Sequence, residues 1–224
     1  MSHIENELSK LKEDVSEMMS LVKSQLTKAK DALFNNDKDL VHEVMNTEMR
    51  VDVLELSIDK YCSRIIALMG PVATDLRFII AMIKMISSIE RIGDNAEGIA
   101  KIVADCDLKL NKEIISKLRI NEMFEISLDM MEKIYDAYLA EDASMARKVF
   151  KKDRKLDEID LAAKATIVKL TEDGKIDVYN ALNWFSIIRK LERTGDLLKN
   201  IGEEIIYHIE ARFVKHKQSK KLLG

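Results

Sequence analysis

The sequence predicts an all-α protein of two tandem three-helix bundles, six long antiparallel helices that an internal duplication relates. Three observations predict this fold. The 224 residues include only one proline and seven glycines, so few residues interrupt helices. Apolar residues recur with helical periodicity almost from end to end. The segment Glu90-Arg-Ile-Gly-Asp94 returns as Glu192-Arg-Thr-Gly-Asp196, which indicates a duplicated unit.

Residues that favour caps and turns divide the periodic stretch into six helices. Asparagine and aspartate favour helix caps, glycine favours the left-handed residue that ends a helix, and proline cannot continue one. The breaks are expected at Asn35–Asp37, Gly70–Pro71, Asp105–Asn111, Glu141–Asp142 and Asp173–Gly174. The predicted helices cover residues 4–34, 38–69, 72–104, 112–139, 143–172 and 176–212.

The last three helices repeat the first three. Asp52 matches Asp157 at an offset of 105 residues, and beyond the second hairpin turn Glu90 matches Glu192 at an offset of 102. Long helices with short connections pack as antiparallel neighbours, so each repeat is expected to form one bundle. The two predicted domains are residues 1–106 and 107–224.

Composition and charge exclude several functional classes. The formal net charge of −3 and the pI near 5.9 argue against nucleic acid as a ligand. No apolar run approaches the roughly 18 residues of a membrane span, and the polar N-terminus does not resemble a signal peptide. We therefore expect a cytoplasmic protein that a membrane partner could recruit to the inner face of the membrane. The basic stretch from Arg212 to Lys221 is expected to be a solvated tail.

The sequence also lacks the residue patterns of common enzymes. It has no nucleophile with a base beside it, no glycine loop to cradle phosphate, and no Cys or His cluster with zinc-site spacing. We therefore predict a protein that is not an enzyme.

Acidic pairs spaced four residues apart lie on the second and third predicted helices of the first repeat. In an antiparallel hairpin, residues at the same height lie symmetrically about the turn. Asp52 and Glu90 are symmetric about Pro71, and so are Glu48 and Asp94. The first bundle should therefore hold two rungs of facing carboxylates, about 6 Å apart along the helices.

The second repeat carries the same arrangement. Asp157 and Glu192 are symmetric about the turn at Gly174-Lys175, and so are Asp153 and Asp196. Glu192 also continues an apolar column, so it should be partly sheltered from solvent.

Such carboxylate groups predict cation binding. Sheltered carboxylates take up protons or hold cations, because uncompensated buried charge is prohibitive. Oxygen ligands without imidazole favour Mg, Ca, Mn or Fe, with Zn less apt. Gly93 and Gly195 each cost a helix about 1 kcal/mol relative to alanine, and room for a metal would explain them. The predicted metal ligands are Glu48, Asp52, Glu90, Asp94, Asp153, Asp157, Glu192 and Asp196.

Two alternatives stay open. A di-metal carboxylate oxidase is also a helical bundle, but that class needs a Glu-x-x-His motif, which this sequence lacks. In the other alternative the bundle is purely structural and its carboxylates form salt-bridge ladders. The cations for such ladders would be Lys84, Arg91, Arg189, Lys190 and Arg193.

The same motifs resemble those of the PhoU family of phosphate-regulation proteins. The first signature comprises Pro71-Val-Ala-Thr-Asp-Leu-Arg77, Lys84 and Ser88-Ile-Glu-Arg-Ile-Gly-Asp-Asn-Ala-Glu-Gly-Ile-Ala100. The second runs from Leu191 to Tyr207, and together they extend the resemblance over nearly the whole chain. The resemblance implies two three-helix bundles with metal clusters on the surface, held by the eight carboxylates named above.

The resemblance also implies a regulatory role. It suggests a homodimeric signalling adaptor that restrains phosphate uptake and phosphate-starvation genes through the ATPase of the Pst phosphate transporter and a membrane sensor histidine kinase. The repeats differ at some motif positions, with Gly98 against Asn200 and Ile92 against Thr194. These departures predict two metal sites that differ in affinity or nuclearity.

Overall fold

Helices form every regular element of the computed structural model, which describes residues 3–106 and 111–212. The first repeat consists of α1 (His3–Asn35), α2 (Lys38–Met69) and α3 (Ala73–Asp105). These bounds agree with the predicted segments to within one residue at each end. The predicted domain boundary after residue 106 adjoins residues 107–110, which lie outside the described residues.

The ends of α2 show why the predicted breaks occur where they do. The Oδ1 atom of Asp37 accepts hydrogen bonds from the backbone N–H groups of Asp39 and Leu40, at 2.9 and 3.2 Å. At the other end, Gly70 adopts a left-handed conformation with φ of 54°, and its N–H donates to the Ile66 carbonyl at 3.3 Å. Residues with a side chain are strained at that φ, which favours glycine at this position.

The second repeat follows the same order, but two of its predicted helices are interrupted. α4 (Lys112–Lys117) and α5 (Ile120–Ala140) replace the single helix predicted over 112–139. α6 (Ala143–Arg147) and α7 (Val149–Glu172) replace the one predicted over 143–172. α8 (Val178–Glu210) is continuous.

The two interruptions have different physical causes. Arg119 takes a left-handed conformation with φ of 57°, which an α-helix cannot include. Lys148 stays right-handed, and its N–H donates to the carbonyl of Met145 at 3.0 Å, the bond of a tighter 3₁₀ turn. Neither residue is a helix breaker, so nothing in the sequence pattern predicted these interruptions.

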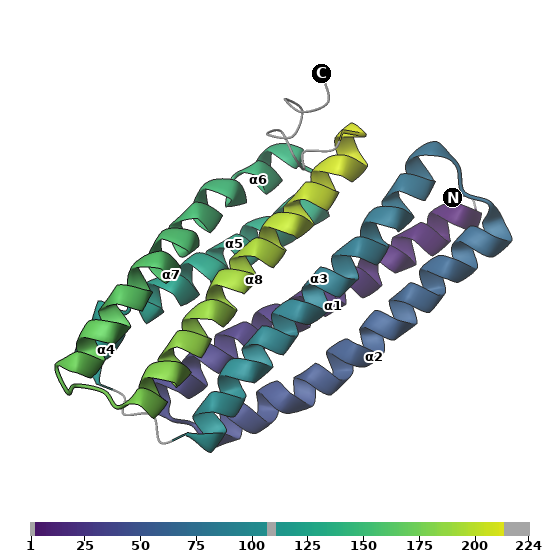
Figure 1. Cartoon of the computed structure of the whole chain (residues 1–224). Helices are drawn as coiled ribbons and strands as arrows, with labels where there is room; N and C mark the ends of the chain where they lie inside the picture. Colours follow the sequence, from purple (N-terminus) through teal and green to yellow (C-terminus); the bar gives the residue numbers. More distant parts are fainter. Residues whose placement is uncertain (1–2, 107–110, 213–224) are drawn as a thin grey trace.

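The two bundles pack against each other through their third helices. Figure 1 shows α1, α2 and α3 as one group and α5, α7 and α8 as the other, with α3 beside α8. Between these two helices, Lys84 pairs with Glu204 at 3.3 Å, and the amide of Asn95 donates to the Thr194 hydroxyl at 3.4 Å. The repeated motifs therefore lie in the middle of two adjoining helices.

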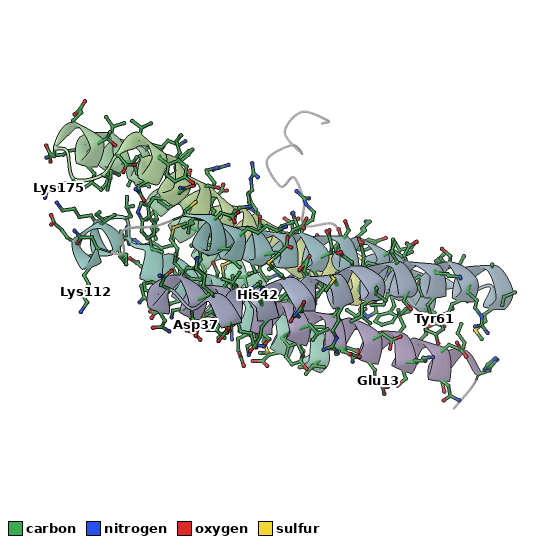
Figure 2. All side chains as sticks on the ribbon, turned by 90° about the horizontal axis from the view of Figure 1, so that it is seen from below. Glu13, Asp37, His42, Tyr61, Lys112 and Lys175 are labelled. Carbon is green, nitrogen blue, oxygen red and sulfur yellow. The ribbon has the colours of Figure 1, made fainter. Side chains whose placement is uncertain are left out.

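At one end of the molecule, an ion pair joins the turn between α7 and α8 to α4. Lys175, in the turn between α7 and α8, pairs with Glu113 of α4 at 2.6 Å. Figure 2 shows Lys112 and Lys175 at the same end, with Tyr61 toward the other. No helix among the described residues is long and apolar enough to span a membrane. Most of the predicted basic tail, residues 213–221, lies outside the described residues.

Candidate functional site

The acidic residues of the first repeat face one another across α2 and α3. The charge of Asp94 is close enough to raise the pKa of Glu48, and the charge of Asp52 is close enough to raise that of Glu90. The first pair agrees with the Glu48–Asp94 rung expected from the symmetry about Pro71, whereas the charge of Glu55 acts on Glu90 more strongly than that of Asp52. Asp52 and Asp94 are exposed, so the cluster opens to the surface.

Glu48 is the inner carboxylate of this cluster. Its residue is only 5% exposed, and burial raises its pKa to about 7. The amide Nε2 of Gln25 donates to Oε2, while Oε1 has no hydrogen-bond partner among the described residues. A buried carboxylate with a neutral neighbour and a free oxygen is poorly compensated when it is ionised.

Gly93 makes room for this carboxylate. A Cβ atom at residue 93 would lie 2.6 Å from Oε2 of Glu48 and 3.1 Å from Oε1 of Gln25. Real side chains do not approach so closely, so Glu48 occupies its place because residue 93 lacks a side chain. The glycine of the motif thus has a reason in the site itself.

Two carboxylates that the sequence analysis did not include extend the cluster. Burial, followed by the charges of Asp94 and Glu55, raises the pKa of Glu90 to about 7. Glu97 also adds to the negative charge around Glu48 and pairs with Lys101 at 2.5 Å. Both additions lie three residues beyond a predicted ligand, a spacing that keeps them on the same helix face.

Among the described residues, the four predicted ligands of the first repeat have no ion pair with a lysine or arginine. In the part of the chain that the structure describes, no lysine or arginine nitrogen lies within 4.0 Å of a carboxylate oxygen of Glu48, Asp52, Glu90 or Asp94. Lys101 is about half exposed and pairs within α3 with Glu97 alone. These four carboxylates therefore have no direct ion pair, and the positive charges of Lys101 and Arg91 act on them only at longer range.

The second repeat contains a lysine at the corresponding place. The Nζ atom of Lys199 lies 2.6 Å from Oδ2 of Asp153 and 2.8 Å from Oδ1 of Asp196. Burial alone would lower the pKa of Lys199, but its hydrogen bonds to both aspartates raise that pKa well above its usual range. The ammonium group thus bridges α7 and α8 across one of the predicted rungs.

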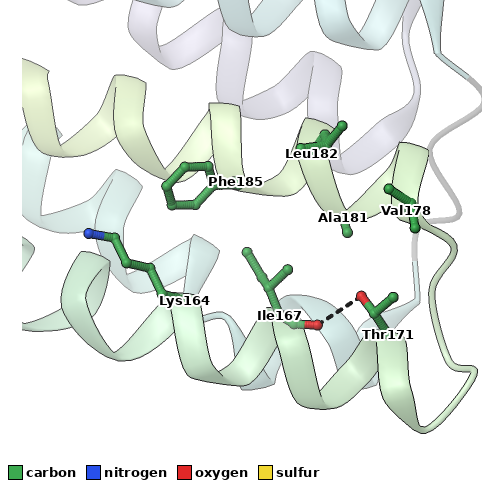
Figure 3. A pocket seen from close by; sticks show the side chains of 7 residues that line it. All are labelled: Lys164, Ile167, Thr171, Val178, Ala181, Leu182 and Phe185. Carbon is green, nitrogen blue, oxygen red and sulfur yellow. Dashed lines mark hydrogen bonds between the residues drawn. The ribbon is translucent and has the colours of Figure 1, made fainter.

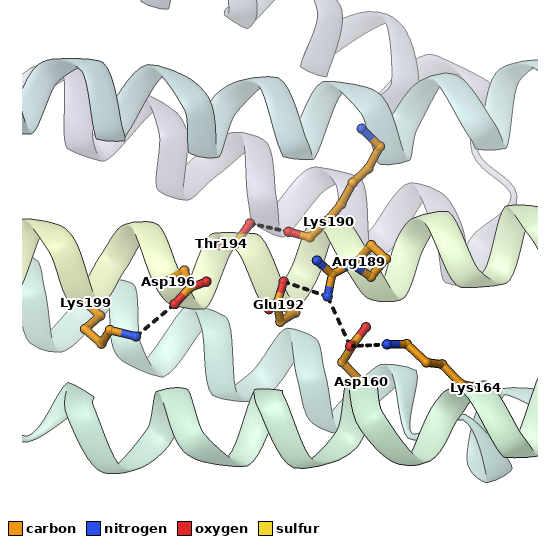
Figure 4. Close-up of polar contacts among 8 residues, drawn as sticks. All are labelled: Asp160, Lys164, Arg189, Lys190, Glu192, Thr194, Asp196 and Lys199. Carbon is orange, nitrogen blue, oxygen red and sulfur yellow. Dashed lines mark hydrogen bonds and ion pairs between the residues drawn. The ribbon is translucent and has the colours of Figure 1, made fainter.

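Arg189 forms ion pairs with carboxylates at the other end of this cluster. The Nη1 atom of Arg189 lies 3.1 Å from Oδ2 of Asp160 and 3.3 Å from Oε2 of Glu192, and Lys164 lies 3.9 Å from Asp160 (Figure 4). Burial raises the pKa of Glu192, and the charge of Arg189 opposes that shift.

The motif glycine also has a different neighbour in this repeat. A Cβ atom at Gly195 would lie 2.4 Å from Cδ1 of Leu156, whereas Oδ1 of Asp153 would be 3.4 Å away. Gly195 therefore accommodates an apolar side chain rather than a carboxylate.

The eight predicted ligands occupy facing helices, but they do not converge on one point. They lie in pairs on α2 (Glu48, Asp52), α3 (Glu90, Asp94), α7 (Asp153, Asp157) and α8 (Glu192, Asp196). Among the described residues, no three His, Cys, Asp or Glu side chains form a group that could hold a metal ion. The backbone sets the heights of the carboxylates, and repulsion between like charges disfavours their close approach without a counterion.

The donor sets of the two repeats therefore fit a metal unequally. Among the described residues, buried carboxylate oxygens without a hydrogen bond occur in both repeats, at Glu48 in the first and at Asp153, Asp160 and Glu192 in the second. The first repeat offers oxygen donors alone, which suits a hard cation. In the second, an ammonium and a guanidinium group already occupy the space between the carboxylates.

Two of the pockets on the surface differ in polarity. A pocket of about 250 Å³ between α7 and α8 is lined chiefly by Ile167, Val178, Leu182 and Phe185, with no titratable pair facing it (Figure 3). A polar hollow of about 420 Å³ between α3 and α8 is lined by Asp94 and Glu97 and by four basic residues, Arg91, Lys101, Lys190 and Arg193. The first cluster thus opens toward a polar hollow beside the interface of the two bundles.

Comparison with known proteins gives matches over both repeats. The family described as the PhoU domain matches residues 15–103 and again residues 120–205. The phosphate-specific transport system accessory protein PhoU homolog 1 of Thermotoga maritima is 33% identical over 206 residues, which cover 92% of this chain and 88% of that protein. The PhoU homolog of Aquifex aeolicus is 33% identical over 217 residues, 96% of each chain.

Solved structures agree with this likeness. The crystal structure of the phosphate transport system regulatory protein PhoU from Streptococcus pneumoniae superposes with a TM-score of 0.86 at 29% identity, covering 95% of this chain and 100% of that one. PhoU from Pseudomonas aeruginosa gives a TM-score of 0.86 at 27% identity, with coverage of 94% and 100%. The predicted fold, two tandem three-helix bundles, is thereby confirmed.

Proposed function

This chain belongs to the PhoU family, and we propose that it is a metal-binding cytoplasmic adaptor that represses phosphate uptake and phosphate-starvation signalling. The observation that carries the regulatory role is the match of the PhoU domain to both repeats, together with relatives named as accessory proteins of phosphate-specific transport. These relatives are named for an accessory role and not for a reaction, so the proposal includes no catalysis.

The acidic cluster of the first repeat supports the metal-binding part of the proposal. Glu48, Asp52, Glu90 and Asp94 would hold a hard cation such as Mg, Mn, Ca or Fe, with Glu55 and Glu97 as neighbouring oxygen donors. A bound cation would supply the positive charge that these carboxylates lack. Binding would then displace the protons that Glu48 and Glu90 retain near neutral pH.

The partners we propose are the ATPase of the phosphate transporter and a membrane sensor histidine kinase, which would recruit this chain to the inner face of the membrane. We also propose that the chain works as a homodimer. Light scattering of the purified protein tests the dimer, and co-purification with each tagged partner tests the contacts.

Gene deletion tests the regulatory role. We expect the deletion to raise phosphate uptake and alkaline phosphatase in phosphate-rich medium, and the wild-type gene to restore repression. Repression that persists in the deletion strain would contradict the proposal. A gene carrying Glu48→Gln with Asp94→Asn should not restore repression if metal binding is required. Glu13→Gln, which changes an exposed carboxylate on α1, is the matched control.

A further inference from the structure

The third helices of the two repeats differ in charge at several positions that the duplication aligns, including Lys101 against Glu203, and two of these differences lie at the acidic clusters. At the offset of 102 residues that joins Glu90 to Glu192, Lys199 corresponds to Glu97 and Arg189 corresponds to Ser87. One of these differences reverses a charge, and the other introduces one. Both new cations lie against carboxylates of the second repeat.

The contacts of Lys199 resemble those expected of a bound cation. Its Nζ joins one aspartate of α7 to one of α8, and the Asp153 side chain is only 3% exposed. Charge-assisted bonds of 2.6 and 2.8 Å are at the short end of the range for lysine and carboxylate. Lys199 and Asp196 are three residues apart on α8, so the helix itself holds the ammonium near this site.

Arg189 makes a second bridge between the same helices. It joins Asp160, whose side chain is 8% exposed, to Glu192, whose side chain is 13% exposed. Figure 4 shows Arg189 between these two carboxylates and Lys199 reaching to Asp196 farther along α8. Lys199 therefore pairs with the buried Asp153 and with Asp196 of α8. Arg189 pairs with the buried Asp160 and with Glu192 of α8.

The corresponding places in the first repeat contain no such cations. Ser87 is exposed and uncharged, and Glu97 adds a carboxylate where Lys199 provides an ammonium. The inner carboxylate Glu48 bonds to the neutral amide of Gln25, whereas its counterpart Asp153 bonds to Lys199. The same backbone frame thus carries an open acidic cluster in one repeat and an internally neutralised one in the other.

We propose that Lys199 and Arg189 take the place of a metal in the second repeat, so that this chain holds metal in its first repeat only. The inference rests on the proposed metal binding of the first repeat. A metal entering the second cluster would have to displace an ammonium from a buried aspartate, and separating a buried ion pair is unfavourable. The duplicated motif therefore gives two copies of a frame but one metal centre.

Titration with Mg²⁺ locates the metal, because a diamagnetic cation shifts the NMR signals of its ligands and their immediate neighbours only. This short range is needed because Asn95 and Thr194, close to the two motif glycines, touch each other at 3.4 Å. In the wild-type chain we expect the amide signals around Gly93 to shift at low Mg²⁺ and those around Gly195 to stay unchanged until Mg²⁺ is at least tenfold higher. Shifts at both glycines at the same Mg²⁺ concentration would overturn the inference.

A variant with first-repeat residues in the second repeat gives the complementary test. Arg189→Ser with Lys199→Glu should shift the amide signals around Gly195 at the Mg²⁺ concentration that affects Gly93. Because the extra carboxylate could unfold the chain, Arg189→Ser with Lys199→Gln is made beside it, and helix content is checked by circular dichroism. Failure of both folded variants to gain Mg²⁺-dependent shifts at Gly195 would also overturn the inference.

This design separates the inference from the proposed function. If the wild-type chain shows no Mg²⁺-dependent shift at either glycine, metal binding by the first repeat is wrong, and that half of the inference is wrong with it. Whether Lys199 and Arg189 keep metal out of the second repeat is then decided by the variants, since a gain at Gly195 supports this role and no gain overturns it. In the first repeat, Ser87→Arg with Glu97→Lys should abolish the shifts around Gly93, and retained shifts there count against the inference.

Discussion

The two repeats place acidic residues at the same heights on their second and third helices, yet they neutralise those residues in different ways. In the first, Glu48 is buried beside a neutral amide and no cation reaches the centre of the cluster in the described part of the chain. In the second, Lys199 and Arg189 bridge the two helices. The difference teaches that a duplication preserves the frame of a site more easily than its chemistry, because charge changes at Lys199 and Arg189 alter how the carboxylates are neutralised.

The largest effect we expect is a loss of stability when the second repeat loses the cation that neutralises its buried aspartate. Lys199→Met leaves Asp153 buried without its cation, which should lower the free energy of unfolding by about 3 kcal/mol at pH 7. Urea unfolding of chelator-treated protein measures it. The counterpart Glu97→Met removes one of several like charges, so stability should be unchanged or higher. Equal losses in both variants would show that the two clusters are neutralised alike.

Removing a proposed ligand should affect metal affinity in one repeat only. Asp94→Asn is expected to weaken Mn²⁺ or Mg²⁺ binding by about 50-fold, a loss within the range seen when groups at metal sites are altered. Asp196→Asn, its counterpart, should change affinity less than twofold. Calorimetric titration of both purified variants measures this contrast, and it disappears if the second repeat also binds metal.

Substitution of the motif glycines should have different effects in the two repeats. Gly93→Ala should displace the Glu48 carboxylate and weaken metal binding by about tenfold, although alanine favours the helix by about 1 kcal/mol. Gly195→Ala should leave metal binding unchanged and instead disturb Leu156, at about 1 kcal/mol or more in stability. Paired measurements of metal affinity and urea unfolding separate the two outcomes. Metal binding unaffected by Gly93→Ala would contradict the role assigned to this glycine.

The last contrast is a pH dependence in the metal-free protein. Because burial raises the pKa of Glu48 and Glu90 from 4.5 to about 7, the folded state holds more protons than the unfolded state between these values. The free energy of unfolding contributed by this cluster should therefore fall as pH rises from about 4.5 to about 7 and level off above it. Glu48→Gln should flatten this slope, whereas Glu13→Gln should retain it. Chemical unfolding in chelator at several pH values provides the measurement.

Much of this site followed from counting residues. Symmetry about Pro71 and about Gly174-Lys175 correctly paired Glu48 with Asp94 and Asp153 with Asp196, because hairpin geometry fixes heights. Counting does not fix side-chain torsions, so the lack of convergence of the carboxylates was not predictable. The metal ligands stay a prediction.

Other features had a signal that the sequence analysis did not use. The difference between Glu97 and Lys199 was visible at the offset of 102, but only the motif positions themselves were compared. The pairing of Arg189 with Asp160 belongs to the salt-bridge alternative, which the second repeat partly satisfies. The break at Arg119 had no signal, because arginine normally continues a helix, whereas this residue has a left-handed conformation.

The difference between Glu97 and Lys199, which occupy corresponding positions in the two repeats, requires only a small change in the gene. Glutamate and lysine codons differ only in their first base, so a single nucleotide separates a carboxylate from an ammonium group at this helix position. On the proposal made above, the number of metal centres in such a chain is a trait that two substitutions, at the positions of Arg189 and Lys199, can change without a change of fold.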